Sequence, residues 1–169
     1  MNKDKITIKK VGAISQIAIE LNKINVFMGE QSSGKSTIAK IITQCRWTEK
    51  EIAIEQSFEK YTNSPSCFVE KLESFHNMQG YFNEESEICF ESETLIFTAT
   101  KNSFHVSWKD KYNYKRSKIA YIPSERTIAI LPEIEKLELP NNYLKSFLFE
   151  WLNARKGYAR KEIPLLDIG

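Results

Sequence analysis

Residues 29–36 read Gly-Glu-Gln-Ser-Ser-Gly-Lys-Ser and match the pattern G-x-x-x-x-G-K-[ST] at every fixed position. Glycine adopts backbone conformations that other residues resist, so a loop of this kind can turn its N–H groups inward around an anion. An apolar run precedes the segment and an amphipathic stretch follows it, which is the strand–loop–helix context that the pattern requires. The segment therefore predicts a phosphate-binding loop between a strand and a helix.

A loop with this pattern is called a Walker A motif or P-loop, and each of its parts has a chemical role. Lys35 would place a positive charge on the β- and γ-phosphates, and the Ser36 hydroxyl would bind the Mg²⁺ that bridges them. Backbone amides at the start of the following helix would complete the anion site. We therefore predict that ATP and Mg²⁺ bind here, with these cofactor-binding residues: Gly29, Glu30, Gln31, Ser32, Ser33, Gly34, Lys35, Ser36 and Thr37.

Hydrophobic periodicity predicts strands before the loop and a helix after it. Apolar and polar residues alternate over residues 5–9 and 17–21, with Gly12 as a turn between them. Residues 24–28 form a short apolar run, typical of a strand buried on both faces. The helix is expected from about Ser36, with one apolar face formed by Ile38, Ile41, Ile42 and Cys45.

A helical insertion is expected over residues 48–80. The sequence Thr48-Glu49-Lys50-Glu51 fits the capping-box pattern, which predicts that a new helix starts at Thr48. Pro65 breaks the helical pattern, and a further helix is expected to stop near Gly80.

The remaining patterns predict strands and then a final helix. Alternating residues favour strands at residues 88–90, 95–97 and 104–108, with Lys101-Asn102 as a hairpin turn between the last two. A further strand is expected at residues 119–122. The final helix would carry an apolar face and a capping asparagine, formed by Leu144, Leu148, Trp151 and Leu152 and by Asn141 or Asn142.

Together these elements predict an α/β fold, a P-loop NTPase lobe with a mixed β-sheet, in which antiparallel strands precede the loop. At 169 residues the chain has the length of one domain, and we expect a single ATP-binding domain over residues 1–169. Hydrophobic residues make up 41% and charged residues 27%, which is typical of a globular protein.

Composition and charge bear on partners and location. The net charge of +2 gives no global field for nucleic acid or an anionic membrane. No apolar run is long enough to span a bilayer, and the charged N-terminus does not resemble a signal peptide, so we expect a cytoplasmic protein. Cys45, Cys67 and Cys89 are widely spaced and are interpreted as apolar filler in a reducing compartment.

The order of strands and loop resembles one family of ATPases. Two strand-like segments precede the strand that feeds the loop, and Val11-Gly12-Ala13-Ile14 lies between the first two. This opening is similar to the N-terminal lobe of ABC-type ATPase heads, which include SMC-like, RecF-like and OLD-like proteins. Residues 119–126, Ile-Ala-Tyr-Ile-Pro-Ser-Glu-Arg, resemble a stretch of bacterial AAA family ATPases from phage-defence and toxin–antitoxin systems.

That resemblance implies roles for two residues outside the loop. Ser124-Glu125-Arg126 would stand near the Q-loop of such a head, which senses the γ-phosphate and Mg²⁺. Glu125 could hold a metal-bound water, which makes it a candidate catalytic and metal-site residue, and Arg126 could reach a phosphate. An equally open alternative is a surface turn in which both side chains are solvated.

The chain also departs from the family pattern. It has no LSGGQ-like signature and no apolar run followed by Asp-Glu, the Walker B motif; Leu165-Leu166-Asp167 is the nearest match, and Pro164 interrupts it. In the family, hydrolysis occurs at a composite dimer site that needs these parts. The resemblance therefore implies an N-terminal half that binds ATP and hydrolyses it slowly or not at all without a partner half or a homodimer.

Two other functions remain open: a small P-loop kinase acting on a metabolite, and an interaction module that ATP switches. The segment at residues 109–118 is basic with interleaved tyrosines and could contact nucleic acid, although a solvated connection is the simpler interpretation. His76 and His105 lack partners at metal-ligand spacing.

Overall fold

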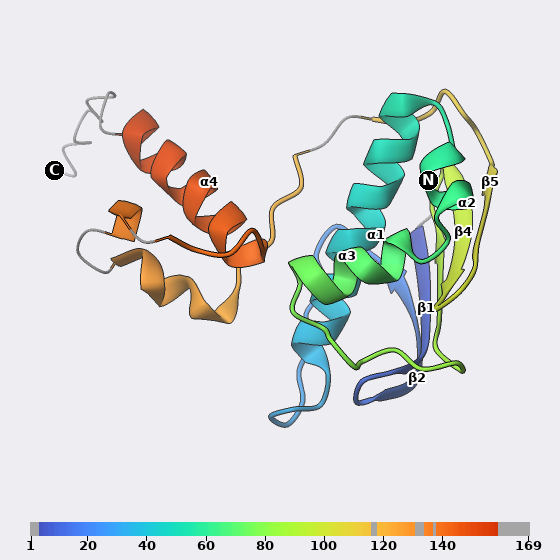
Figure 1. Ribbon diagram of the computed structural model, residues 1–169, viewed down its shortest axis with the longest axis horizontal. Coiled ribbons are helices and arrows are strands. Elements are labelled where there is room, and N and C mark those ends of the chain that lie inside the picture. Colours follow the sequence, from blue (N-terminus) through green and yellow to red (C-terminus); the bar gives the residue numbers. More distant parts are fainter. Residues whose placement is uncertain (1–3, 116–117, 131–133, 137, 159–169) are drawn as a thin grey trace, which may run out of the picture. The chain divides into compact units, whose positions relative to one another are not determined.

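The computed structural model describes residues 4–115, 118–130, 134–136 and 138–158 (Figure 1). The chain divides into two compact units, Met1–Ile119 and Ala120–Gly169. In the described residues the first unit combines one antiparallel sheet with three α-helices, and the second is helical. The molecule is therefore mixed α/β, as the sequence predicted.

The sheet of the first unit has five strands in the order β2-β1-β3-β4-β5. Every neighbouring pair is antiparallel, so the described sheet is not the mixed sheet that we expected. The predicted alternating segments are confirmed as strands, including the two that precede the glycine-rich segment. Their bounds are β1 Asp4–Val11, β2 Ile14–Leu21, β3 Glu87–Glu91, β4 Leu95–Thr100 and β5 Phe104–Trp108.

Strand register places the apolar residues of the central strands on one buried face. Ile6 of β1 lies opposite Ile19 of β2 and Phe90 of β3, and Ile8 lies opposite Ile88. Side chains alternate between the two faces of a strand, so this register gathers them into one core. Ile6, Ile8, Ile88 and Phe90 are at most 1% exposed.

The helix after the loop, α1 (Lys35–Glu55), is longer than predicted. We expected a new helix at Thr48, but α1 runs through this residue without interruption. Gln44, Thr48 and Ile52 continue the buried face of Ile38 and Ile41, and neither glycine nor proline intervenes to end the helix. The Thr48 hydroxyl accepts hydrogen bonds from Gln44 and Tyr61, at 3.3 and 3.4 Å, instead of capping a helix.

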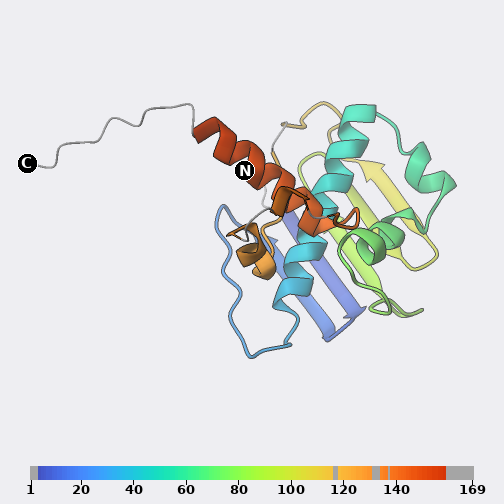
Figure 2. The same cartoon turned by 60° about the vertical axis from the view of Figure 1, so that its left-hand side comes forward.

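Two shorter helices, α2 (Glu59–Asn63) and α3 (Cys67–Phe75), follow α1. The predicted break near Pro65 is confirmed, and α3 ends shortly before Gly80. Figure 2 shows α1 crossing one face of the sheet, with α2 and α3 on the same side. Phe68 and Leu72 of α3 join the core and have no exposed surface.

The apolar segment at residues 24–28 is not a strand, which corrects the prediction. Ile24, Val26 and Met28 are 79%, 76% and 89% exposed, and only Phe27 packs against the core. Asn22 and Asn25 close a turn, since the Asn22 N–H donates to Asn25 Oδ1 and the Asn25 side chain donates to the Asn22 carbonyl, both at 2.9 Å. A strand needs a neighbour for its backbone groups, and no strand of the described sheet pairs with this segment.

The second unit contains the 3₁₀ helices η1 (Ser124–Ile130) and η2 (Ile134–Lys136) and the helix α4 (Tyr143–Tyr158). Asn142 caps α4 as predicted, because its Oδ1 accepts the Leu144 N–H at 3.0 Å. The strand expected at residues 119–122 is not formed, and Ile122 is 65% exposed. Pro123 ends the apolar run, and none of the described strands pairs with it.

Candidate phosphate-binding site

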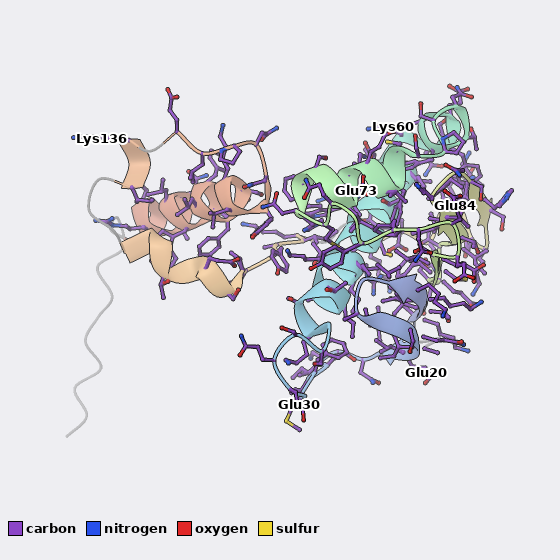
Figure 3. The ribbon with its side chains drawn as sticks, turned by 60° about the horizontal axis from the view of Figure 1, so that its bottom comes forward. Glu20, Glu30, Lys60, Glu73, Glu84 and Lys136 are labelled. Atoms are coloured by element: carbon purple, nitrogen blue, oxygen red, sulfur yellow. The ribbon has the colours of Figure 1, made fainter. Side chains whose placement is uncertain are left out.

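The glycine-rich loop, residues 29–34, joins the exposed segment 24–28 to the first turn of α1. Ser32 and Gly34 have φ angles of 64° and 90°, and the Ser33 N–H lies 3.4 Å from the Glu30 carbonyl oxygen. Positive φ at Gly34, immediately before α1, is a conformation that favours glycine. Figure 3 shows Glu30 on the loop, away from the sheet. The two positive φ angles turn the backbone just before α1.

The side chain of Lys35 folds back onto the glycine-rich loop. Its ammonium group donates to the Gly29 carbonyl at 2.8 Å and to Ser33 Oγ at 3.2 Å, and it also donates to the Glu30 carbonyl. Three oxygens of the loop therefore surround one positive charge. The ammonium group therefore lies directly against the backbone of the glycine-rich loop.

The first turn of α1 presents its backbone amides without a competing cap. No side chain caps the turn, and it contains no acidic residue. The first helical hydrogen bond runs from the Ile38 N–H to the Gly34 carbonyl at 2.9 Å. The N–H groups at residues 35–37 precede this bond, and the positive end of the helix dipole lies beside them. These amides suit an anion such as a phosphate.

The two hydroxyl residues after Lys35 differ in exposure. Ser36 is exposed, so its hydroxyl is accessible to a metal ion carried by a nucleotide. Thr37 is 6% exposed and packs into the base of α1. Among the loop residues Glu30, Gln31, Ser32 and Ser33 are all exposed. The predicted residues 29–37 thus lie together in one loop and helix start. The Ser36 side chain is open to solvent, whereas the Thr37 side chain is buried against the helix.

Gly34 lies close to Ile14 of β2, a proximity that we did not predict. A Cβ placed on Gly34 would come within 3.0 Å of Ile14 Cγ1, and Ile14 is itself 7% exposed. A side chain at position 34 would therefore meet the first residue of β2. The only sequence signal for this contact was the apolar residue after the Gly12 turn, which does not identify its partner.

Glu125 and Arg126 lie in the second unit, within η1. Glu125 accepts hydrogen bonds from the Ser124 hydroxyl at 2.8 Å and from the Tyr143 hydroxyl at 3.1 Å. The side chain of Arg126 and the segment Leu165-Leu166-Asp167 lie outside the described residues. A position of Glu125 or Arg126 beside the loop therefore stays a prediction.

The other candidates are placed in the first unit. His105 is exposed on β5, as expected of a solvated strand position, whereas His76 is fully buried. In the basic segment, Lys109 pairs with Glu91 at 2.7 Å and Tyr112 is 87% exposed. Cys45 is buried and has a free thiol, in agreement with a filler role.

A scan against protein-family models found no matching family, and searches of curated proteins and of solved structures returned no match. Among the helices of the described residues, none has the length and apolar character needed to cross a membrane. The same part of the chain contains no group of three or more acidic, histidine or cysteine side chains placed to hold a metal ion.

Proposed function

We propose that the first unit binds ATP with Mg²⁺ on residues 29–37, as the N-terminal lobe of an ABC-type ATPase head. The observation that carries the proposal is the position of the Lys35 ammonium among three oxygens of the glycine-rich loop. A triphosphate in the loop would replace these oxygens as the partner of the charge. The uncapped amides of α1 and the exposed Ser36 hydroxyl supply the other contacts that Mg²⁺·ATP requires.

The order of the elements favours this lobe over a small P-loop kinase. Strands β1 and β2 form an antiparallel hairpin before the loop. In small nucleotide kinases the loop usually follows the first strand, so a hairpin at this position is not expected there. The hairpin also lies next to the loop, since a Cβ on Gly34 would meet Ile14 Cγ1 at 3.0 Å.

The exposed segment 24–28 supports a partner for this lobe. Ile24, Val26 and Met28 alternate in sequence and are all more than three-quarters exposed. An alternating apolar row on a segment that none of the described strands pairs with is a surface that a further β-strand can cover. The proposed occupant is an apolar strand of the catalytic half of the head, which would also supply the Walker B carboxylate.

The first test is an equilibrium titration with a fluorescent ATP analogue and Mg²⁺, competed by ATP and by GTP. We expect binding that favours ATP and that weakens about ten- to a hundred-fold in Lys35→Ala, because a charge-assisted contact is lost. The matched control is Lys23→Ala, which removes the same charge from an exposed position shortly before the loop. Equal affinity in Lys35→Ala and the wild-type chain would contradict the proposal.

Hydrolysis is tested separately, by release of phosphate from the purified chain. We expect slow turnover or none, because catalysis in this class requires the second half and dimerisation. Turnover that is abolished in Lys35→Ala would show that the chain is an ATPase by itself. Turnover that depends on an added metabolite would favour the kinase.

A second candidate function is an interaction module that ATP switches, and the same exposed segment favours it. The segment leads directly into the loop, so a ligand that orders the loop would also affect this surface. Sedimentation velocity with and without Mg²⁺·ATP tests this function. A dimer that forms only with ATP and is lost in Val26→Asp would favour the switch.

A further inference from the structure

We infer that the base of the nucleotide stacks on Tyr81, which lies beside the turn between β1 and β2. This inference rests on the proposed function, because it extends the phosphate site toward the rest of the same ligand. It identifies a nucleobase subsite formed by Tyr81 and the Gly12 turn. The sequence patterns assigned no role to either residue in ligand binding.

The backbone of Tyr81 is fixed on two sides. The Gly12 N–H donates to the Tyr81 carbonyl at 2.9 Å, and the Tyr81 N–H donates to the Met78 carbonyl at 3.2 Å. Met78 is 1% exposed, so this part of the segment after α3 is anchored in the core. A residue held in this way loses little further conformational freedom when a ligand stacks on it.

The ring of Tyr81 lies over Gly12. A Cβ on Gly12 would come within 2.5 Å of Tyr81 Cδ1 and 2.8 Å of Cε1, and Gly12 has a φ of 55°. The absence of a side chain at this position is what allows the ring to cover the turn. Tyr81 as a residue is nevertheless 38% exposed, which leaves room for a second planar group to pack on its side chain.

The Gly12 turn is connected to the glycine-rich loop by a short path. Ile14, two residues after Gly12, lies so close to Gly34 that a Cβ on Gly34 would be 3.0 Å from Ile14 Cγ1. Chain geometry therefore keeps the Cα atoms of Gly12 and Gly34 within about 14 Å of each other. Figures 1 and 2 both place the β1–β2 turn, the start of α1 and the segment after α3 at the same end of the first unit. This upper limit on the Cα separation does not exceed the reach of an extended nucleoside triphosphate.

Exposure and strand direction single out Tyr81. Among the described aromatic residues of the first unit, Tyr81 and Tyr112 are the large exposed ones. Tyr112 follows the end of β5, where Trp108 pairs with Leu95. These strand ends lie at the end of the sheet opposite to the β1–β2 turn. Tyr81 is therefore the exposed aromatic ring at the end of the unit that carries the glycine-rich loop.

The test compares Mg²⁺·ATP with Mg²⁺·tripolyphosphate by titration calorimetry on the full chain. Stacking contributes to binding of the base and not to binding of the phosphates. We expect Tyr81→Ala to weaken ATP binding about five- to 150-fold, and GTP binding likewise, while affinity for tripolyphosphate is unchanged. Tyr81→Phe retains a ring and should keep wild-type affinity, and Tyr112→Ala is the matched control with no effect.

A second variant, Gly12→Ala, tests the same ring by moving it instead of removing it. Gly12→Ala leaves Tyr81 in the chain but displaces its ring, so the loss of ATP affinity relative to tripolyphosphate should recur. Unchanged ATP affinity in Tyr81→Ala, or an equal loss for both ligands, would overturn the base site alone. Lys35→Ala should lose both ligands. A wild-type chain that binds neither would overturn the proposed function, and the base site with it.

Discussion

The Lys35 ammonium donates a hydrogen bond to the carbonyl oxygen of Gly29, six residues earlier in the chain, at 2.8 Å. The side chain thus closes the glycine-rich loop from inside. The bond lies on the exposed side of the unit, where water can replace either partner. It therefore contributes little to the stability of the fold, and under the proposed function it holds the charge in reserve for the phosphates.

The first prediction is that Lys35→Ala changes the free energy of unfolding by less than about 1 kcal/mol. Ile38→Ala, one turn along the same helix, removes a side chain that is 6% exposed and should cost about 2–4 kcal/mol. Urea denaturation followed by far-UV circular dichroism measures both values. A large loss in Lys35→Ala would mean that the loop lysine is a structural residue, and the binding test would then need Lys35→Arg.

The second prediction concerns Glu51, which joins the three helices of the first unit. Burial of Glu51 raises its pKa, but hydrogen bonds from Lys60, Lys71 and Tyr61 together lower the pKa by more than burial raises it. The net result is a pKa of about 2. The folded pKa lies below the unfolded value of 4.5, so this carboxylate stabilises the fold above pH 4.5. The contribution is lost as pH falls from 4.5 toward 2.

We expect Glu51→Gln to lower stability by about 1–2 kcal/mol at pH 7 and to reduce the loss of stability between pH 4.5 and 2. Urea denaturation at pH 7, 4 and 3 measures both effects. Glu59→Gln is the matched control, because Glu59 is an exposed carboxylate in the neighbouring helix α2. If the two variants have the same pH profile, Glu51 has no special role in acid unfolding.

The third prediction concerns His76, which is fully buried and stacks on Trp47 with ring centroids 5.6 Å apart. Burial, with a smaller contribution from the charge of Lys40, lowers the pKa of His76 to about 4 from an ordinary 6.5. Between pH 6.5 and 4, His76 is therefore protonated in the unfolded chain and neutral in the folded chain. Stability should fall by up to about 3 kcal/mol as pH decreases from 6.5 to 4, and the change should be complete near pH 4.

His76→Phe keeps a ring against Trp47 and removes the titrating group, so it should flatten the profile between pH 6.5 and 4. The other histidine, His105, is exposed, and His105→Gln should leave the profile as it is in the wild-type chain. Unfolding followed by tryptophan fluorescence, to which Trp47 contributes, is the measurement. A profile that His76→Phe leaves unchanged would assign the acid sensitivity to the carboxylates.

Local patterns predicted most of the elements of the first unit. Strands β1 and β2 alternate over residues 5–9 and 17–21 and are joined by a glycine turn, so their identity depends on neighbours in sequence. The break expected at Thr48 was wrong because a capping box is a local signal, whereas the burial of Thr48 between Gln44 and Tyr61 depends on α2. Tertiary packing decided the outcome there.

The candidate site divides in the same way. Residues 29–37 lie together because they are consecutive, so a sequence pattern was sufficient to find them. The contacts of Ile14 with Gly34 and of Tyr81 with Gly12 join residues that are far apart in the chain, and no spacing rule predicts them. A position for Glu125 beside the loop is of this second kind and stays a prediction.

The last prediction concerns neighbouring residues of the exposed segment, Val26 and Phe27. A strand buried on both faces would make both essential, but Val26 is 76% exposed whereas Phe27 packs against the core. We expect Val26→Ser to change the free energy of unfolding by less than about 0.5 kcal/mol. Phe27→Ala should cost about 1–2 kcal/mol, because it uncovers part of an apolar surface that is only half-buried.

Thermal and urea denaturation of the two variants distinguish the arrangements directly, with Met28→Ser as a second exposed position. Equal losses in Val26→Ser and Phe27→Ala would mean that the segment is already covered in the free chain, by a strand or by a second copy. If a second copy of the chain covers the segment, the losses of stability in Val26→Ser and Phe27→Ala should depend on protein concentration. If a strand of the same chain covers it, they should not. Loss at Phe27 alone would leave the row of Ile24, Val26 and Met28 accessible to the strand that the proposed partner supplies.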